Sequence, residues 1–144
     1  MATVKKFEDL GIWQLAREIC KEIFHIIKST PLEKDYNLRN QIDDSSGSIM
    51  DNIAEGFERD GTNEFKQFLA IAKGSCGETR SQLYRILDRK YIDKEKFEAI
   101  SGKAITLGKM IGSFQQYLNR SGYQGIKYKK SKPETRNQKP ETRN

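Results

Sequence analysis

Apolar residues recur at alternating spacings of three and four along most of the chain, the pattern of helices that bury one face. It predicts four helices, at about residues 10–29, 38–57, 63–90 and 94–120. The connections are short, which favours antiparallel neighbours. The expected fold is therefore all-α: a left-handed, antiparallel up-down-up-down four-helix bundle.

The first predicted helix has the broadest apolar face, a stripe that runs from Trp13 to Ile27. Three isoleucines at positions 12, 19 and 26 flank this stripe. Such a face is wider than a two-helix seam requires and suggests more apolar surface than one small bundle buries. Asp9 is the expected N-cap of this helix, Pro31 ends it, and Asp93 is the expected cap of the fourth helix.

Small and polar residues crowd the expected inner faces of the second and third helices. Gly costs about 1 kcal/mol against Ala inside a helix, so several glycines indicate close backbone approach. Two interpretations stay open: the two helices approach closely within one bundle, with hydroxyls bonded to carbonyls, or the same surface meets a symmetry mate. The candidate oligomer or helix-contact residues are Ser45, Ser48, Asn52, Glu55, Gly56, Gly74 and Ser75.

Three strings carry a family resemblance: FEDLGIWQLA from residue 7, SSGSIMDNIAEGFER from residue 45 and FLAIAKGSCGETRSQLYRILD from residue 68. They resemble the small four-helix-bundle family first noticed in intervening sequences of bacterial 23S ribosomal RNA, which is similar to the accessory variability protein of diversity-generating retroelements. The resemblance spans roughly residues 5–120, and Asn-Ile-Ala-Glu-Gly at 52–56 is its most specific part.

The resemblance implies a ring of five subunits, and together with the broad apolar face it favours a homo-oligomer, with a pentamer as the expected order. The chain departs from the family pattern on its second helix. Asp43 and Asp44 stand where many members carry a basic pair, and Met50 stands where they often have proline. The aspartates remove positive charge from this helix. The resemblance therefore supports the expected fold and oligomer more strongly than it supports the expected binding partner.

Charge is distributed unevenly along the 144 residues. The net charge is +6, but residues 122–144 hold seven Lys or Arg against two Glu, which leaves the preceding 121 residues near neutrality. We therefore expect a bundle domain at 1–121 and a disordered basic tail at 122–144. The tail repeats KPETRN at 132–137 and 139–144. This duplication is either a basic tag or a translated DNA repeat.

Candidate phosphate contacts lie on the third helix and in the tail. Lys66, Lys73 and Arg80 recur at seven-residue intervals, which places them on one outward stripe, and a solvated helix face with intrahelical ion pairs is the competing interpretation. The tail interleaves cations with tyrosines, a combination that suits single-stranded RNA. The candidate nucleic-acid-binding residues are Lys66, Lys73, Arg80, Arg85, Lys127, Lys129 and Lys130.

Enzymatic chemistry has little support in the sequence. His25 is the one histidine, and the chain has neither the Glu-x-x-His pairs of di-iron bundles nor a zinc spacing or phosphate-binding glycine loop. Cys20 and Cys76 fall on expected core positions, as inert thiols do. A Glu55–Glu78 carboxylate pair is the remaining enzymatic hypothesis, a metal or shared-proton site. We expect no enzyme, no metal site and no cofactor.

The functional expectation is a non-enzymatic, oligomeric protein that associates with RNA or DNA, in the first place structured RNA, as an adaptor to a possible protein partner. The alternative is a protein-protein interaction scaffold without nucleic-acid binding. No apolar run approaches the roughly 20 residues that a membrane span needs, so no membrane association is expected. The N-terminal residues have no apolar segment of the signal-peptide type, and we expect a cytoplasmic protein.

Overall fold

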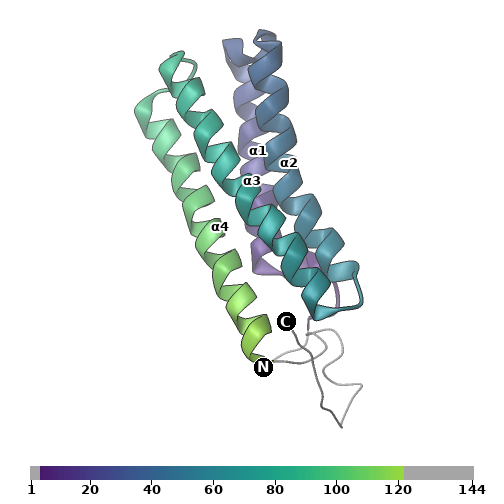
Figure 1. Ribbon diagram of the computed structural model, residues 1–144. Coiled ribbons are helices and arrows are strands. Elements are labelled where there is room, and N and C mark those ends of the chain that lie inside the picture. Colours follow the sequence, from purple (N-terminus) through teal and green to yellow (C-terminus); the bar gives the residue numbers. More distant parts are fainter. Residues whose placement is uncertain (1–3, 122–144) are drawn as a thin grey trace.

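The computed structural model describes residues 4–121, which form a bundle of four long helices (Figure 1). Within this range none of the helices is long and apolar enough to cross a membrane. The elements in chain order are the 3-10 helix Phe7–Asp9, α1 (Gly11–Ser29), the 3-10 helix Pro31–Lys34, α2 (Tyr36–Glu58), α3 (Thr62–Asp88) and α4 (Lys94–Ser121). The predicted all-α bundle is confirmed, with helix bounds within two residues of those expected from the apolar pattern.

Each helix packs on the next along the chain, and α1 also contacts α4, which closes the bundle. Figure 1 shows α4 beside α3 on one side and α1 beside α2 on the other, with neighbouring helices antiparallel. The apolar positions of all four helices meet in one continuous core. The seven-residue pattern of α4 contributes buried side chains from Phe97, Ile100, Ala104, Leu107, Ile111 and Leu118.

The apolar face of α1 differs from its prediction. Ile12, Ile19 and Ile26 were expected to flank the core, but all three are buried in it, whereas Trp13 and Cys20 are only half-buried. Because α1 packs against both α2 and α4, the covered arc of the helix is wide enough to take both rows. The inference that these isoleucines provide surplus apolar surface is therefore wrong.

The helix ends agree with the sequence in part. Asp93 accepts a hydrogen bond from the backbone N–H of Lys96 (2.8 Å), as a capping side chain does. Asp9 does not cap α1: it lies inside the preceding 3-10 helix, and Leu10 occupies the N-cap position without a side-chain hydrogen bond. That short helix is fixed instead by an edge contact between the rings of Phe7 and Trp13 (5.2 Å between centroids).

Helix α3 ends two residues before the predicted position because the chain turns into the left-handed region. Lys90 has a φ of 63°. Its N–H bonds to the carbonyl of Leu87 (2.9 Å) and that of Tyr91 to the carbonyl of Ile86 (3.2 Å). This pair of bonds is the usual C-terminal stop of a helix, in which glycine is the preferred residue at the left-handed position.

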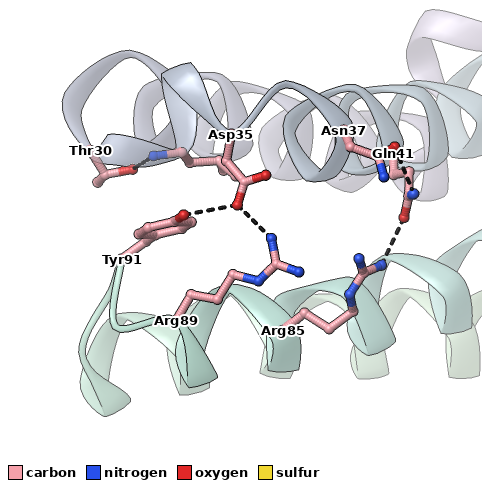
Figure 2. A network of polar contacts seen from close by, with 8 residues as sticks. Thr30, Asp35, Asn37, Gln41, Arg85, Arg89 and Tyr91 are labelled. Carbon is pink, nitrogen blue, oxygen red and sulfur yellow. Dashed lines mark hydrogen bonds and ion pairs between the residues drawn. The ribbon is translucent and has the colours of Figure 1, made fainter.

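A polar network joins the two loops at this end of the bundle (Figure 2). A carboxylate oxygen of Asp35, between α1 and α2, accepts hydrogen bonds from the guanidinium of Arg89 and from the Tyr91 hydroxyl (2.8 Å). The Tyr91 hydroxyl and Arg89 together lower the pKa of the Asp35 carboxyl. We call these three residues the loop clamp. It ties the first helical hairpin to the second.

Candidate nucleic-acid interface

Helix α3 has two flanks with different chemistry. On one flank it meets α2 through small and hydroxyl-bearing residues, which we call the α2–α3 seam. On the other it meets α4 along a line of cations, which we call the α3–α4 groove. The seam consists of Ser45, Ser48, Asn52 and Gly56 of α2 with Ser75, Thr79 and Gln82 of α3. The groove consists of Lys66, Lys73, Gly77, Arg80 and Tyr84 of α3 with Ile105, Gly108, Gly112 and Asn119 of α4.

Hydroxyl groups in the seam bond to one another across the two helices. The Ser45 hydroxyl donates to the side-chain oxygen of Gln82 (2.6 Å) and lies 2.9 Å from the Thr79 hydroxyl. Ser75 donates to the Ser48 hydroxyl (3.0 Å). Because Ser45, Thr79 and Gln82 are buried, these bonds satisfy groups that water cannot reach. The seam therefore holds α2 and α3 within one bundle.

Gly56 brings the two backbones together at the other end of the seam. A Cβ at this position would lie 2.7 Å from Cβ of Phe68 and 2.9 Å from a ring carbon of Phe65. Real Cβ atoms do not approach other heavy atoms so closely, so only glycine fits without displacement. Asn52, one turn earlier, donates to the Ser48 carbonyl (2.8 Å) on its own helix.

Two of the candidate contact residues lie outside the seam. Gly74 is exposed, and a Cβ added there would meet nothing within 4 Å. The Glu55 carboxylate accepts a hydrogen bond from Arg59 of its own helix (2.8 Å), on the surface. Thr79 and Gln82 were missed as seam residues, although they continue the inward face of Ser75 at helical spacings of four and seven.

The proposed Glu55–Glu78 pair does not form. Glu55 adjoins the Gly56–Phe68 contact, whereas Glu78 adjoins the Ser45–Thr79 contact. About ten residues of helix, or about 15 Å, separate these two contacts along the seam. Within residues 4–121 no group of three or more His, Cys, Asp or Glu side chains is placed to hold a metal ion. This hypothesis is therefore wrong in its geometry.

The groove forms because residues at seven-residue intervals on α3 lie opposite residues at seven-residue intervals on the antiparallel helix α4. The Lys66 ammonium donates to the Asn119 side chain (2.6 Å), and the Lys73 ammonium lies 3.5 Å from where a Cβ of Gly112 would be. One further heptad along each helix places Arg80 opposite Ile105. The three cations thus lie beside α4 and not on the outward face of α3, where they were expected. Lys66 and Arg80 are half-buried there.

None of the three groove cations forms an ion pair with a carboxylate in the part of the chain that is described. Lys66 binds the Asn119 amide oxygen and not a carboxylate of its own helix, and the buried Nε of Arg80 has no hydrogen-bond partner there. Some basic side chains elsewhere do form such pairs: Lys103 binds Glu22 and Glu18, which raise the pKa of its ammonium, and Lys28 binds Glu33 at 3.2 Å. The groove therefore concentrates positive charge without internal neutralisation.

Arg85 lies on the opposite flank from these cations. It donates to the Gln41 side chain of α2 (2.8 Å), as Figure 2 shows. Five residues after Arg80, a helix has turned by about 140°, which carries Arg85 away from α4. The structure thus separates Arg85 from the other three helical candidates. Lys127, Lys129, Lys130 and the duplicated segment lie outside the described residues.

Both cysteines are protonated thiols at neutral pH. Burial raises the pKa of Cys20 and of Cys76 to about 11 in each case. The Cys20 thiol also donates to the Ser46 carbonyl (3.2 Å). A thiol is nucleophilic as the thiolate, so neither group is activated for covalent or redox chemistry.

Comparisons with known proteins agree with this fold. The family model of the 23S rRNA-intervening sequence protein matches residues 8–113. Among solved structures, the chain is similar to a protein of unknown function from the S23 ribosomal protein family of Bacteroides thetaiotaomicron VPI-5482, with 24% identity and a TM-score of 0.68. The similarity covers 73% of this chain and 98% of that one. No curated protein matches the sequence significantly.

Proposed function

Because the chain belongs to the 23S rRNA-intervening sequence protein family, we propose that it is a non-enzymatic, oligomeric protein that associates with nucleic acid, in the first place structured RNA. It acts as an adaptor, holding the nucleic acid through its phosphates and leaving other surfaces free for a protein partner. The solved relative has unknown function, so the support beyond family membership comes from the chain's own charge arrangement.

The observation that carries the proposal is the unpaired charge of the α3–α4 groove. Lys66, Lys73 and Arg80 span 14 residues of helix, or about 21 Å, a length over which several phosphates are met. Their lack of carboxylate partners among residues 4–121 leaves their charge available to an external anion. Contacts of this kind neutralise phosphates and position the nucleic acid without reading its sequence.

The local arrangement of the cations matters for binding a polyanion because the bundle has almost no net charge of its own. Lysines and arginines up to residue 121 are nearly balanced by acidic residues. The outer face of α2 is acidic, with Asp43, Asp44 and Asp51 all exposed. Such a surface repels phosphates and directs a polyanion towards the opposite flank of α3.

The test is binding of a structured RNA hairpin by the full-length protein across a salt series. A triple variant, Lys66→Ala with Lys73→Ala and Arg80→Ala, should bind at least tenfold more weakly. Its salt dependence should flatten by about three contacts, because each lost phosphate contact removes roughly 0.7–0.9 from the slope of log affinity against log salt.

The matched control removes three exposed lysines outside the groove: Lys21, Lys34 and Lys96. It changes the net charge equally and should bind nearly as the native protein does. A second comparison, Lys127→Ala with Lys129→Ala and Lys130→Ala, measures the tail separately. Full affinity and an unchanged salt slope in the groove variant would rule the groove out, and loss of binding in the tail variant alone would assign the activity to the tail.

The oligomer part of the proposal is supported by surface that the single chain leaves uncovered. Ile71 is 51% exposed on α3, and Gly47 and Gly74 have nothing within 4 Å of an added Cβ. A homo-oligomer would use such open positions for close approach of a second copy, and the family resemblance favours five subunits. Light scattering at micromolar concentration should give a mass near five chains, and a monomer mass would exclude the oligomer.

The same exposed surface favours the second candidate function, a protein-interaction scaffold without nucleic-acid binding. Phe24 and Ile71 are large apolar side chains on the surface. If the scaffold is the function, Ile71→Asp should abolish capture of a protein partner, nuclease treatment should leave that capture intact, and the RNA hairpin should not bind. The opposite pattern supports the adaptor.

A further inference from the structure

An exposed aromatic ring continues the line of groove cations. Tyr84 follows Lys66 by 18 residues, or about five helical turns, which places both on one face of α3 about 27 Å apart. The tyrosine is 52% exposed, and its ring centroid lies 4.7 Å from that of Phe97 on α4, at an angle of 56°. Phe97 is buried and packs against the ring, while about half of the tyrosine remains exposed to solvent.

Glycines line the surface between the cations and this ring. A Cβ added at Gly77 or Gly108 would meet nothing within 4 Å, and one at Gly112 would meet only the Lys73 side chain. The apolar residue on the α4 side is Ile105, which is 39% exposed. A ligand lying along α3 would therefore reach the cations and Tyr84 together without displacing a bulky group.

Arg80 is the groove cation nearest to Tyr84 in sequence, and its side chain is half-buried. Its Nε is buried and has no hydrogen-bond partner among the described residues. Solvent does not reach this Nε, so an external phosphate would bind the terminal guanidinium nitrogens, which are strong donors to phosphate. Arg80 precedes Tyr84 by one helical turn, so a phosphate at Arg80 would bring the attached nucleoside within reach of the ring.

We infer that the α3–α4 groove takes an unpaired nucleic-acid strand, with phosphates on Lys66, Lys73 and Arg80 and a base stacked on Tyr84. The inference rests on the proposed function and names the form of nucleic acid that the groove prefers. A duplex presents phosphates to the cations but keeps its base faces inside the stack, so Tyr84 offers it little. An unpaired strand exposes base faces, which stack on aromatic side chains without sequence preference.

The experiment compares an unpaired RNA oligonucleotide with a duplex of the same sequence, by fluorescence anisotropy with the full-length protein at one salt concentration. Tyr84→Ala should weaken binding of the unpaired strand about tenfold and leave duplex binding almost unchanged. Tyr84→Phe keeps the ring and its contact with Phe97, and should bind as the native protein does. Thermal melts of both variants show whether the bundle remains folded.

Tyr36→Ala is the matched control. Tyr36 is 61% exposed on α2 and lies under the Arg39 guanidinium (4.8 Å), so it is also an exposed aromatic ring beside a cation, but outside the groove. Its removal should change neither ligand's affinity. A fluorescent adenine analogue in the unpaired strand supplies a stacking signal, which the protein should quench with Tyr84 or Phe at position 84 but not with Ala.

The outcomes separate this inference from the proposed function. If the groove triple variant loses binding but Tyr84→Ala keeps full affinity for the unpaired strand, the groove still binds nucleic acid and the stacking inference is overturned. Equal loss of both ligands in Tyr84→Ala, or loss in Tyr84→Phe, also overturns it. If the native protein binds neither ligand, the proposed function and this inference fall together.

Discussion

The two flanks of α3 use small residues in opposite ways. In the α2–α3 seam, Gly56 is enclosed by Phe65 and Phe68, and the serine hydroxyls bond to serine and threonine hydroxyls of the facing helix. In the α3–α4 groove, Gly77 and Gly108 face open space. The same residue types therefore close one interface and leave the other uncovered. Their presence on a helix does not by itself show whether that face of the helix is buried or open.

The seam and the groove are also expected to differ in how much they contribute to the free energy of unfolding. Seam residues satisfy buried polar groups and remove steric conflict, so changes there act on folding. Groove residues are exposed or half-buried and their cations lack carboxylate partners in the described chain, so changes there leave folding largely untouched. A family of substitutions along α2, α3 and α4 can test this division directly.

The largest effect is expected at Gly56. Gly56→Ala should lower the free energy of unfolding by about 2–3 kcal/mol, because the added methyl overlaps Phe65 and Phe68. Chemical denaturation followed by circular dichroism measures the change. The control is Gly102→Ala at an exposed position on α4, where an added Cβ meets nothing within 4 Å, and it should raise stability slightly; if both substitutions behave alike, the seam is not closed as described.

A smaller loss is expected from the hydroxyl bonds of the seam. Ser45→Ala should cost about 1–2 kcal/mol, because it leaves the buried Gln82 side-chain oxygen without its donor. The same denaturation experiment applies. Ser81→Ala, at an exposed position on α3, should change stability by less than about 0.5 kcal/mol; an equal loss there would show that the effect of Ser45→Ala does not come from the buried hydrogen bond.

A gain is expected in the groove. Gly77→Ala should stabilise the protein by about 0.5–1 kcal/mol, since the new methyl meets no atom within 4 Å and alanine favours the helix. Thermal unfolding should show a higher midpoint. A lower midpoint would mean that the groove is covered in solution, for example by a second copy, and light scattering of the variant distinguishes that case.

The smallest effect on stability is expected from the groove cations. Lys66→Ala removes one surface hydrogen bond, to Asn119, and should change the free energy of unfolding by less than about 0.5 kcal/mol. The same variant should still weaken RNA binding. Asn119→Ala breaks the same hydrogen bond but keeps the cation, so it should match Lys66→Ala in stability and the native protein in binding.

The sequence was sufficient for the fold because the apolar spacing is regular in every helix. The sequence was insufficient to predict which neighbouring helix each helix face contacts. Ile12 and Trp13 both fit an apolar stripe, and the choice between them depends on where α4 packs. The place of Lys66 and Lys73 likewise depends on the register between α3 and α4, which brings Asn119 and Gly112 opposite them. Residue spacing within one helix contains no information on that register.

Site residues were predictable where their own type was unusual for a helix interior, as for Ser45 and Gly56. Tyr84 was not singled out, because its aromatic ring fits a core position as well as a surface one. Only its neighbours decide between these: Phe97 supports the ring and Gly77 leaves room beside it. The predicted Glu55–Glu78 pair was wrong for a related reason. Two residues on facing helices are close only if they also lie at the same level along the helix axes.

The loop clamp gives the bundle one end that responds to acid. The Asp35 carboxyl has a lowered pKa in the folded protein, so its stabilising contribution is complete above the ordinary pKa of aspartate and is lost as pH falls towards the lowered value. Protonation would release Arg89 and Tyr91 together and uncouple the two hairpins at that end alone. In hydrogen exchange, acid should therefore lower the protection of the amides around Lys90 and the start of α2, relative to their intrinsic rates at each pH, before it lowers that of the α2–α3 seam, so that unfolding begins at a defined end of the molecule.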